Sequence, residues 1–279
     1  MTNGIVPNSQ KQLLRFDGHA LAFHSWFTSY PNEVMPGFFR MVGSAVERHD
    51  PTHLIVTFDP PPPTFRHKMY PDYKANRPPA PEGLIEDCER VRERLEELDV
   101  VFCTVEGYEA DDVLGTLSSR ASMSGFQTMI LTSDLDLLQL VSPITEVEVF
   151  SQYWAKRSFD VEAAKRRFGG LAPENIPDYK ALAGDTSDNL PGVPGIGHVS
   201  ATAVLGEYDN LDGVYENLDA ISELPLRGAK RVSRLLAEHR EQAFLMRTLT
   251  TIVCDVPVDV DIDGALIEES GLQAVEALA

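Results

Sequence analysis

Apolar and polar positions divide the chain into a first part that mixes strand and helix patterns and a second part with helix patterns alone. Short, nearly continuous apolar runs are typical of buried strands. They predict strands at 11–16, 53–58, 100–103, 127–131 and 146–150, the last at a sheet edge. Amphipathic patterns predict helices between them at 21–27, 33–48, 82–98 and 113–121. Further helices are predicted at 161–167, 173–183, 211–216, 230–238 and 241–249, before an extended stretch at 252–262 that we expect to return to the body.

The change of pattern predicts three parts: a polar tail at 1–10, an α/β core at 11–175 and a helical region at 176–279. No run of about 18 apolar residues occurs, so we expect no membrane-spanning helix. The start of the chain lacks the basic residues and apolar centre of a secretory signal. Three widely spaced cysteines, Cys88, Cys103 and Cys254, form no CxxC pair, which favours a reduced cytoplasmic protein without structural disulfides or zinc.

Acidic residues gather where predicted strands end. Asp17, Asp59 and Asp134 each follow a predicted strand, and ligands of open α/β sheets bind in the crevice at the carboxyl ends of the strands. The densest acidic stretch contains Glu109, Asp111, Asp112, Asp134 and Asp136. Carboxylates brought together repel unless cations neutralise them, and hard oxygen ligands suit Mg²⁺ or Mn²⁺. The alternative is that the acids at 109–112 only favour the positive end of a helix dipole and are solvated there.

The formal net charge of −19 argues against a general nucleic-acid coat, which would be basic. A metal-dependent nuclease remains compatible with this charge if its DNA contacts are confined to local basic patches. One such patch, at 60–81, is bordered by prolines and contains Phe65, Arg66, His67, Lys68, Tyr70, Tyr73, Lys74 and Arg77. Cations interleaved with rings suit a phosphate backbone and unstacked bases. The alternative is a solvated loop whose tyrosines pack on the core.

A glycine-rich stretch follows a further acidic pair. Asp185 and Asp188 precede P-G-V-P-G-I-G, which leads into a predicted helix near residue 200. Its glycines, Gly192, Gly195 and Gly197, let backbone amides approach a phosphate closely at the start of that helix. A helix–hairpin–helix element grips one strand of duplex DNA in this way, without reading its sequence. Taken alone, the glycine pattern is that of a plain turn; directly after D-x-x-D it favours a DNA-binding element.

Five long sequence blocks resemble those of a known family. They are FDGHALAF, FDPPPPTFRHKMYPDYKANRPP, GYEADDVLGTL, TSDLDLLQLV and GDTSDNLPGVPGIG. With them the chain resembles the 5′-nuclease (flap endonuclease) superfamily over nearly its whole length, most closely the 5′→3′ exonuclease domain of bacterial DNA polymerase I and its stand-alone relatives. The resemblance implies an α/β fold: a PIN-like core whose mostly parallel twisted sheet is flanked by helices, a helical arch at about 60–81, and a C-terminal helical region with a helix–hairpin–helix-type motif at about 185–205. No polymerase sequence follows, so we expect a free-standing nuclease.

The resemblance also implies roles for individual residues. The implied metal ligands are Asp17, Asp59, Glu109, Asp111, Asp112, Asp134, Asp136, Asp185 and Asp188. Arg66, Lys74 and Arg77 are implied catalytic residues of the arch, through which a single-stranded 5′ end passes. The implied DNA-contacting residues are Phe65, His67, Tyr70, Tyr73, Gly195, Ile196, Gly197 and His198. Relatives often bind K⁺ at the hairpin.

The implied reaction is hydrolysis of DNA phosphodiesters by two Mg²⁺ or Mn²⁺ ions about 4 Å apart, which leaves a 5′-phosphate and a 3′-hydroxyl. The implied partners are DNA with 5′ flaps, nicks or recessed 5′ ends, and RNA or RNA–DNA hybrids as further substrates, in replication and repair. We expect a cytoplasmic monomer with nucleoid-associated activity and no membrane partner. We also expect the arch to be mobile, because of its proline borders and its charge.

The chain departs from the family pattern at a few positions. Ser133 and Leu135 stand where Gly and Lys are common, and the hairpin lacks the usual Lys near Val199. His19 and His24 replace an Asn and an Arg that are often found. These departures bear on DNA affinity and on the balance of flap endonuclease against exonuclease. All nine implied carboxylates are present, which argues against an inactive relative.

Three other functions are compatible with parts of the sequence. PIN-like ribonucleases share a carboxylate-lined α/β site, but they are generally shorter and lack the arch and the hairpin. A phosphatase that uses Asp17 as nucleophile would need D-x-D, and position 19 is His. A structure-specific DNA-binding module with weak or no catalysis is suggested by Leu135 and the altered hairpin, whereas the retained acids count against it.

Overall fold

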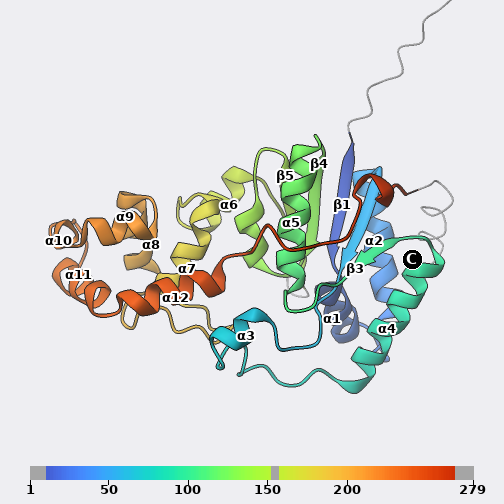
Figure 1. The fold of residues 1–279 in the computed structure, drawn as a ribbon, viewed down its shortest axis with the longest axis horizontal. Helices are drawn as coiled ribbons and strands as arrows, with labels where there is room; N and C mark the ends of the chain where they lie inside the picture. The colour runs from blue at the N-terminus through green and yellow to red at the C-terminus, as the bar shows by residue number, and fades with distance from the viewer. Residues whose placement is uncertain (1–10, 152–156, 268–279) are drawn as a thin grey trace, which may run out of the picture.

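Six strands form the central sheet of the computed structural model, which describes residues 11–151 and 157–267 (Figure 1). They are β1 (Gln12–Asp17), β2 (His53–Thr57), β3 (Val101–Cys103), β4 (Gln127–Thr132), β5 (Thr145–Val149) and β6 (Arg157–Phe159). Their order is β3-β2-β1-β4-β5-β6, and all neighbours are parallel except β5 and β6. The mostly parallel sheet is therefore confirmed. The predicted tail at 1–10 lies outside the described residues.

One prediction about the sheet is wrong: β5 is not an edge strand. The antiparallel strand β6 pairs with it through Val147 and Phe159, Glu148 and Ser158, and Val149 and Arg157. The hydrophobic pattern missed β6 because it has only three residues, of which Phe159 alone is buried. A strand with one buried side chain shows no alternation that a sequence pattern could reveal.

Helices cover both faces of the sheet. One face packs against α1 (Gly18–Thr28), α2 (Met35–His49) and α4 (Glu82–Glu97), and the other against α5 (Ala110–Met123). Side chains alternate along β1, so that Leu14 and Phe16 pack with the first group of helices while Leu13 packs with α5. Both faces of β1 are thus buried, and its apolar run is interrupted by Arg15, which donates to the Leu114 carbonyl of α5.

The rest of the chain is helical. Its elements are η1 (Leu135–Leu140), α6 (Val161–Arg167), η2 (Pro173–Asn175), α7 (Ile176–Ala183), α8 (His198–Tyr208), α9 (Leu211–Glu216), α10 (Leu218–Ile221), α11 (Ala229–Glu238) and α12 (Arg240–Thr250). Its core is continuous with the sheet, because Ile130 of β4 and Val147 of β5 belong to the same apolar cluster as Leu182 and Val204. Among the described helices, none has the length and apolar character needed to cross a membrane.

The extended C-terminal stretch returns to the body, as predicted. Figure 1 shows it in red, running from α12 across α5 to the strands β1 and β2. The Val253 amide donates to Asp112 Oδ1 at 2.9 Å, and the Val256 amide donates to Thr116 Oγ1 at 3.0 Å. Past the 3-10 helix η3 (Asp263–Ala265), the Ile267 amide donates to the Thr52 carbonyl at 3.1 Å. The stretch forms no regular strand and is held by side chains of α5.

Gly115 of α5 provides a test of this packing. A Cβ added there would lie 2.6 Å from Ile252 Cγ2 and 3.0 Å from Cys254 Sγ. Gly115→Ala is therefore expected to lower the free energy of unfolding by about 1–3 kcal/mol through overpacking. Gly206→Ala in α8 is the control, because a Cβ there meets nothing within 4 Å. It should raise the free energy of unfolding by up to about 1 kcal/mol, since alanine has the higher helix propensity. Urea denaturation measures both, and equal effects would contradict close packing of the stretch on α5.

Candidate metal centre

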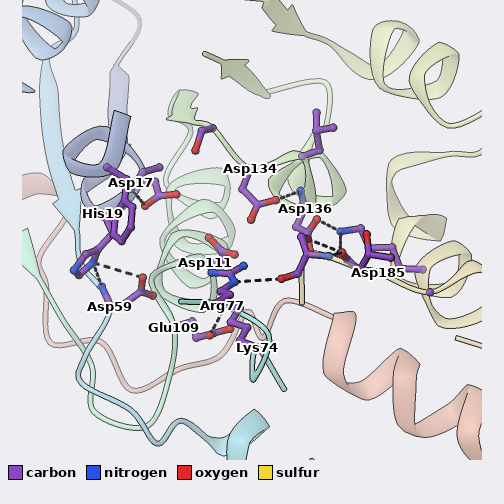
Figure 2. A pocket seen from close by; sticks show the side chains of 18 of the residues that line it. Asp17, His19, Asp59, Lys74, Arg77, Glu109, Asp111, Asp134, Asp136 and Asp185 are labelled. Carbon is purple, nitrogen blue, oxygen red and sulfur yellow. Dashed lines mark hydrogen bonds and ion pairs between the residues drawn. The ribbon is translucent and has the colours of Figure 1, made fainter. Parts of the chain in front are cut away.

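Seven of the predicted acidic ligands line one cavity of about 770 Å³ at the carboxyl ends of β1, β2 and β4. They are Asp17, Asp59, Glu109, Asp111, Asp134, Asp136 and Asp185. Figure 2 shows Asp17, Asp111 and Asp134 around a shared space, with Asp136 and Asp185 to one side. Asp188 adjoins them, because one oxygen each of Asp136, Asp185 and Asp188 lie within 4.8 Å of one another. The fold thus brings eight of the nine predicted acids together.

Hydrogen bonds of 2.8 to 3.0 Å hold the strand-end aspartates in place. Asp17 caps α1, accepting from the Ala20 amide at 3.0 Å through Oδ1, while its Oδ2 accepts from Thr132 Oγ1 at 2.8 Å. The same Thr132 hydroxyl oxygen accepts from the Asp134 amide at 2.9 Å. Asp134 in turn caps η1 by accepting from the Asp136 amide at 2.8 Å. Helix caps and one threonine therefore fix the carboxylates before any ligand binds.

Asp59 is held by two other segments. Its Oδ1 accepts from the Ala110 amide at 2.7 Å, at the N-terminus of α5, and its own amide donates to His19 Nδ1 at 2.9 Å. Because Nδ1 accepts, the neutral imidazole of His19 carries its proton on Nε2. Burial lowers the pKa of His19, although Asp59 opposes this change. His19 therefore fixes the backbone of a predicted ligand.

Four of the carboxylates, Asp17, Asp59, Asp111 and Asp134, form what we call the open acidic group. Among the described residues, no Lys or Arg nitrogen lies within 4.0 Å of their oxygens. Burial, followed by repulsion from Asp59, raises the pKa of Asp17 to about 7. Burial and the charges of Asp134 and Asp17 raise the pKa of Asp111 well above its usual value. The open acidic group therefore favours protonation or an added cation.

The other carboxylates of the site already have cationic partners. Asp136, Asp185 and Asp188 form the paired acidic group. Lys180 Nζ lies 2.6 Å from Asp185 Oδ2 and contacts Asp136 Oδ1, and Arg77 Nη2 lies 2.6 Å from Asp188 Oδ1. Lys180 was not predicted. A single lysine in a largely apolar helix just before D-x-x-D is the signal that could have indicated it.

Glu109 also has cationic partners. Lys74 Nζ lies 2.7 Å from its Oε1, and Arg66 Nη1 lies 3.2 Å from its Oε2. Burial would raise the pKa of Glu109, but Lys74 and Arg66 outweigh it and hold the pKa below its ordinary value. Lys74 and Arg77, two of the three predicted catalytic cations, line the cavity.

Two predicted roles do not fit the structure: Asp112 as a metal ligand and Arg66 as a catalytic cation. Asp112 is fully buried, Arg66 is 3% exposed, and neither lines the cavity. Arg66 donates to both Asp112 oxygens, at 2.7 and 2.8 Å, and to the carbonyls of Leu249 and Thr251. Consecutive helical residues point about 100° apart, so Asp112 faces the core while its neighbour Asp111 faces the cavity.

The aromatic residues predicted to contact DNA do not line the cavity. Tyr73 is buried, and its hydroxyl donates to Glu109 and Asp188 at 2.8 and 3.0 Å, so its ring is not free to stack on a base. His67 caps the short helix α3 (Phe65–Met69) by accepting from the Thr64 amide at 3.2 Å. Phe65 packs against Tyr108, and Tyr70 packs against the apolar core. Tyr70 and Tyr73 therefore pack on the core, as the alternative to DNA contact predicts.

The centre of the 60–81 segment is tied to the helical part, in addition to the contacts of Phe65 just before α5 and of Arg66 with α5 and the C-terminal stretch. The Lys74 amide donates to the Asp188 carbonyl at 3.0 Å. The side-chain amide of Asn189 donates to the Asp72 carbonyl at 2.7 Å, and that of Asn76 to the Thr186 carbonyl at 2.8 Å. The segment thus crosses the site and closes one side of it.

The glycine-rich hairpin leads into α8 as predicted. Gly192 and Gly195 have φ of +62° and +85°, values that other residues rarely adopt. A Cβ at Gly195 would also meet Arg231 Nη2 at 2.9 Å, so the glycine lets an arginine of α11 lie against the turn. Ile196 is buried and anchors the hairpin, while Gly197 forms the cap of α8, with open space where its Cβ would be.

His198 opens α8 and is the last of the predicted hairpin contacts. Its Nδ1 lies 3.0 Å from the Tyr179 hydroxyl, and the two rings meet edge to face. Val199, where the family often has a lysine nearby, is 71% exposed.

Comparisons with known proteins match both parts of the chain. Residues 12–169 match the family model of the 5′-3′ exonuclease N-terminal resolvase-like domain, and residues 171–271 match that of the 5′-3′ exonuclease C-terminal SAM fold. The chain is 39% identical to DNA polymerase I of Chloroflexus aurantiacus over 95% of its length, and 38% identical to that of Pseudomonas aeruginosa over 97%. It spans only 29% and 30% of these relatives.

Solved structures share the fold at lower identity. A T5 5′-exonuclease with bound divalent metal ions (zinc) is 22% identical, with a TM-score of 0.72 over 96% of this chain and 97% of that one. The catalytic core of Rad2 in complex with DNA substrate is 16% identical, with a TM-score of 0.59 over 95% of this chain and 86% of that one.

Asp112 and Asp111 form a matched pair for testing the buried ion pair. Asp112→Ala leaves the Arg66 charge buried without its main partner and is expected to cost about 3–5 kcal/mol of unfolding free energy. Asp111→Ala, without metal, should cost little or even stabilise, because it removes a carboxylate repelled by Asp134 and Asp17. Denaturation in EDTA compares the two, and equal losses would contradict the different roles assigned to these neighbours.

Asp17 should make the stability of the metal-free protein depend on pH. Its pKa is raised from an ordinary 3.8 to about 7 in the folded state, so between these values the folded carboxyl holds a proton that the unfolded chain has lost. The free energy of unfolding should therefore fall as the pH rises from about 4 to about 7. Asp17→Asn should flatten this slope in denaturation curves recorded in EDTA. An unchanged slope would show that Asp17 does not titrate in this range.

Proposed function

Since this chain belongs to the 5′-3′ exonuclease family, we propose that it is a structure-specific, divalent-metal-dependent 5′ nuclease that hydrolyses DNA phosphodiesters. The observation that carries the proposal is the cavity of seven carboxylates, four of which have no Lys or Arg partner among the described residues. Such a group is unstable when fully ionised unless a cation is added.

The donor set fits Mg²⁺ or Mn²⁺. The acidic groups offer carboxylate oxygens, which hard divalent ions prefer, and none of the described residues that line the cavity is a cysteine. The T5 5′-exonuclease that shares this fold binds divalent metal ions, which supports a metal site in this chain by similarity. We assign one ion to the open acidic group and a second to the paired acidic group, with Glu109 beside them. Divalent ions bound there would supply activation of the attacking water and stabilisation of the leaving oxygen.

Lys74 and Arg77 would act on the phosphate itself. Both line the cavity, with side chains 20% and 48% exposed, and both are bound to carboxylates, Glu109 and Asp188. A phosphate in the cavity would offer these cations new anionic partners, and their charge would stabilise the transition state. Arg66 takes no part in this step; it holds the segment that carries Lys74 and Arg77 against α5.

We propose that the helical region at 176–279 holds duplex DNA through the hairpin, and that the core at 11–175 carries out the cleavage. The amides at Gly195, Gly197 and His198 would contact phosphates, with K⁺ as a further ligand of the hairpin, and Arg231 adds a charge beside it. The substrates would be 5′ flaps, nicks and recessed 5′ ends, in replication and repair. Structures of a T5 flap endonuclease with DNA and of Rad2 with DNA substrate support this class.

Further parts of the proposal concern the setting of the protein. RNA and RNA–DNA hybrids would be additional substrates, because contacts to the backbone need not test the 2′-hydroxyl. We propose a monomer acting at the bacterial nucleoid; the bacterial origin of the DNA polymerase I relatives supports the bacterial setting alone.

Cleavage of a 5′-labelled flap duplex and a matched nicked duplex tests the function. With Mg²⁺ or Mn²⁺ the chain should cut near the flap junction, and EDTA should stop it. Asp134→Ala should lower the rate by more than about a hundredfold, since even outer partners of metal sites cost ten- to a hundredfold. Binding of the flap should persist in this variant.

The control is Asp263→Ala, an exposed carboxylate bound to Lys11. Its cleavage rate should equal that of the unchanged chain. Retained flap binding without cleavage in either metal would favour the DNA-binding module instead, and release of mononucleotides alone would indicate an exonuclease without flap activity.

A further inference from the structure

The two acidic groups of the cavity differ in charge balance. In the open acidic group, four carboxylates have no Lys or Arg partner among the described residues. In the paired acidic group, three carboxylates share Lys180 and Arg77. Lys74 also lies 4.0 Å from Asp188 Oδ2, but its charge is balanced by Glu109, whose Oε1 is closer at 2.7 Å. When all are ionised, the paired group carries one unbalanced negative charge and the open group carries four. A divalent ion is therefore attracted much more strongly to the open group.

Lys180 occupies the place where a cation would bind the paired group. Its ammonium lies 2.6 Å from Asp185 Oδ2 and contacts Asp136 Oδ1, so it bridges the same two carboxylates that would hold an ion. The residue is only 8% exposed on α7, between the buried Ala181 and the partly buried Tyr179. Because its stem is packed, the ammonium is held at the carboxylates rather than swinging in solvent.

We propose that Lys180 is an internal counter-ion, which keeps Asp136 and Asp185 together in the metal-free protein and which a divalent ion must displace to bind there. The inference rests on the proposed function, because it assumes ion positions at both acidic groups. Its consequence is ordered loading: the open acidic group fills first, and the paired acidic group fills at a higher ion concentration. Lys180 is thus a positioning residue that sets the affinity of the second ion.

Binding of Mn²⁺ to the full chain without DNA, measured by calorimetry and by the EPR signal of free Mn²⁺, tests the inference. The unchanged chain should bind one ion at least about tenfold more tightly than a second. Lys180→Met should raise the affinity for the second ion by at least about tenfold, because the repulsion between the ammonium and the ion is lost; even a small part of that Coulomb interaction suffices for this change. The affinity for the first ion should stay nearly unchanged. Lys180→Arg, which keeps the charge, should leave the second ion weak.

Lys11→Met is the matched control. It also removes one positive charge, but just before β1, where Lys11 pairs with Asp263 at the end of the strand that lies away from the cavity. It should change neither ion affinity. Thermal unfolding checks each variant, and Lys180→Gln, which keeps a polar end group, replaces Lys180→Met if the latter does not fold.

Three results would overturn the inference: equal second-ion affinity in Lys180→Met and the unchanged chain, weaker affinity in Lys180→Met, or no second ion in either. Weaker affinity would mean that Lys180 only aligns the two acids. Failure of the proposed function is a separate outcome, because it is decided by cleavage of the flap duplex, whereas these measurements contain no DNA.

Discussion

Mutual repulsion among the carboxylates at the carboxyl ends of the strands is the constraint on which this structure depends. The parallel register of β1, β2 and β4 forces Asp17, Asp59 and Asp134 together. Part of the cost is offset by amides at the starts of α1, α5 and η1, where helix dipoles also favour negative charge. Another part is offset by cations from distant segments, which is why the 60–81 segment and α7 converge on these strand ends.

A second ion pair keeps that convergence in place. Arg66 and Asp112 are buried together, and each also bonds to the C-terminal stretch, Arg66 through the Thr251 carbonyl and Asp112 through the Val253 amide. The pair thus joins α3, α5 and the end of α12 at one point. A buried pair with all these bonds satisfied is costly to break at either end, although an apolar replacement of both partners could be as stable. Its role is structural, and it leaves Lys74 and Arg77 as the cations that face the cavity.

Much of the fold and most of the acidic site could be predicted from the sequence. Strand-length apolar runs and helix periodicity mark the elements, and an aspartate directly after a strand lies at the carboxyl edge wherever the strand sits in the sheet. The failures have physical causes. Asp111 and Asp112 are adjacent acids of one sequence motif, and the sequence does not tell them apart. Only the orientation of α5 about its axis places Asp111 in the cavity and Asp112 in the core. Lys180 and the burial of Tyr73 depend on packing between segments far apart in the chain, which no local pattern encodes.

The C-terminal stretch also brings the two ends of the described chain together. Lys11 pairs with Asp263 at 2.5 Å, and Ile267 bonds to Thr52 beside the start of β1, across the sheet from the acidic cavity. A covalent link between residues 267 and 11 would therefore span little distance and would leave the cavity untouched. New ends could then be opened at the exposed turn around 227–228. The architecture is thus suited to circular permutation, in which the order of the elements changes while the arrangement of the acids is kept.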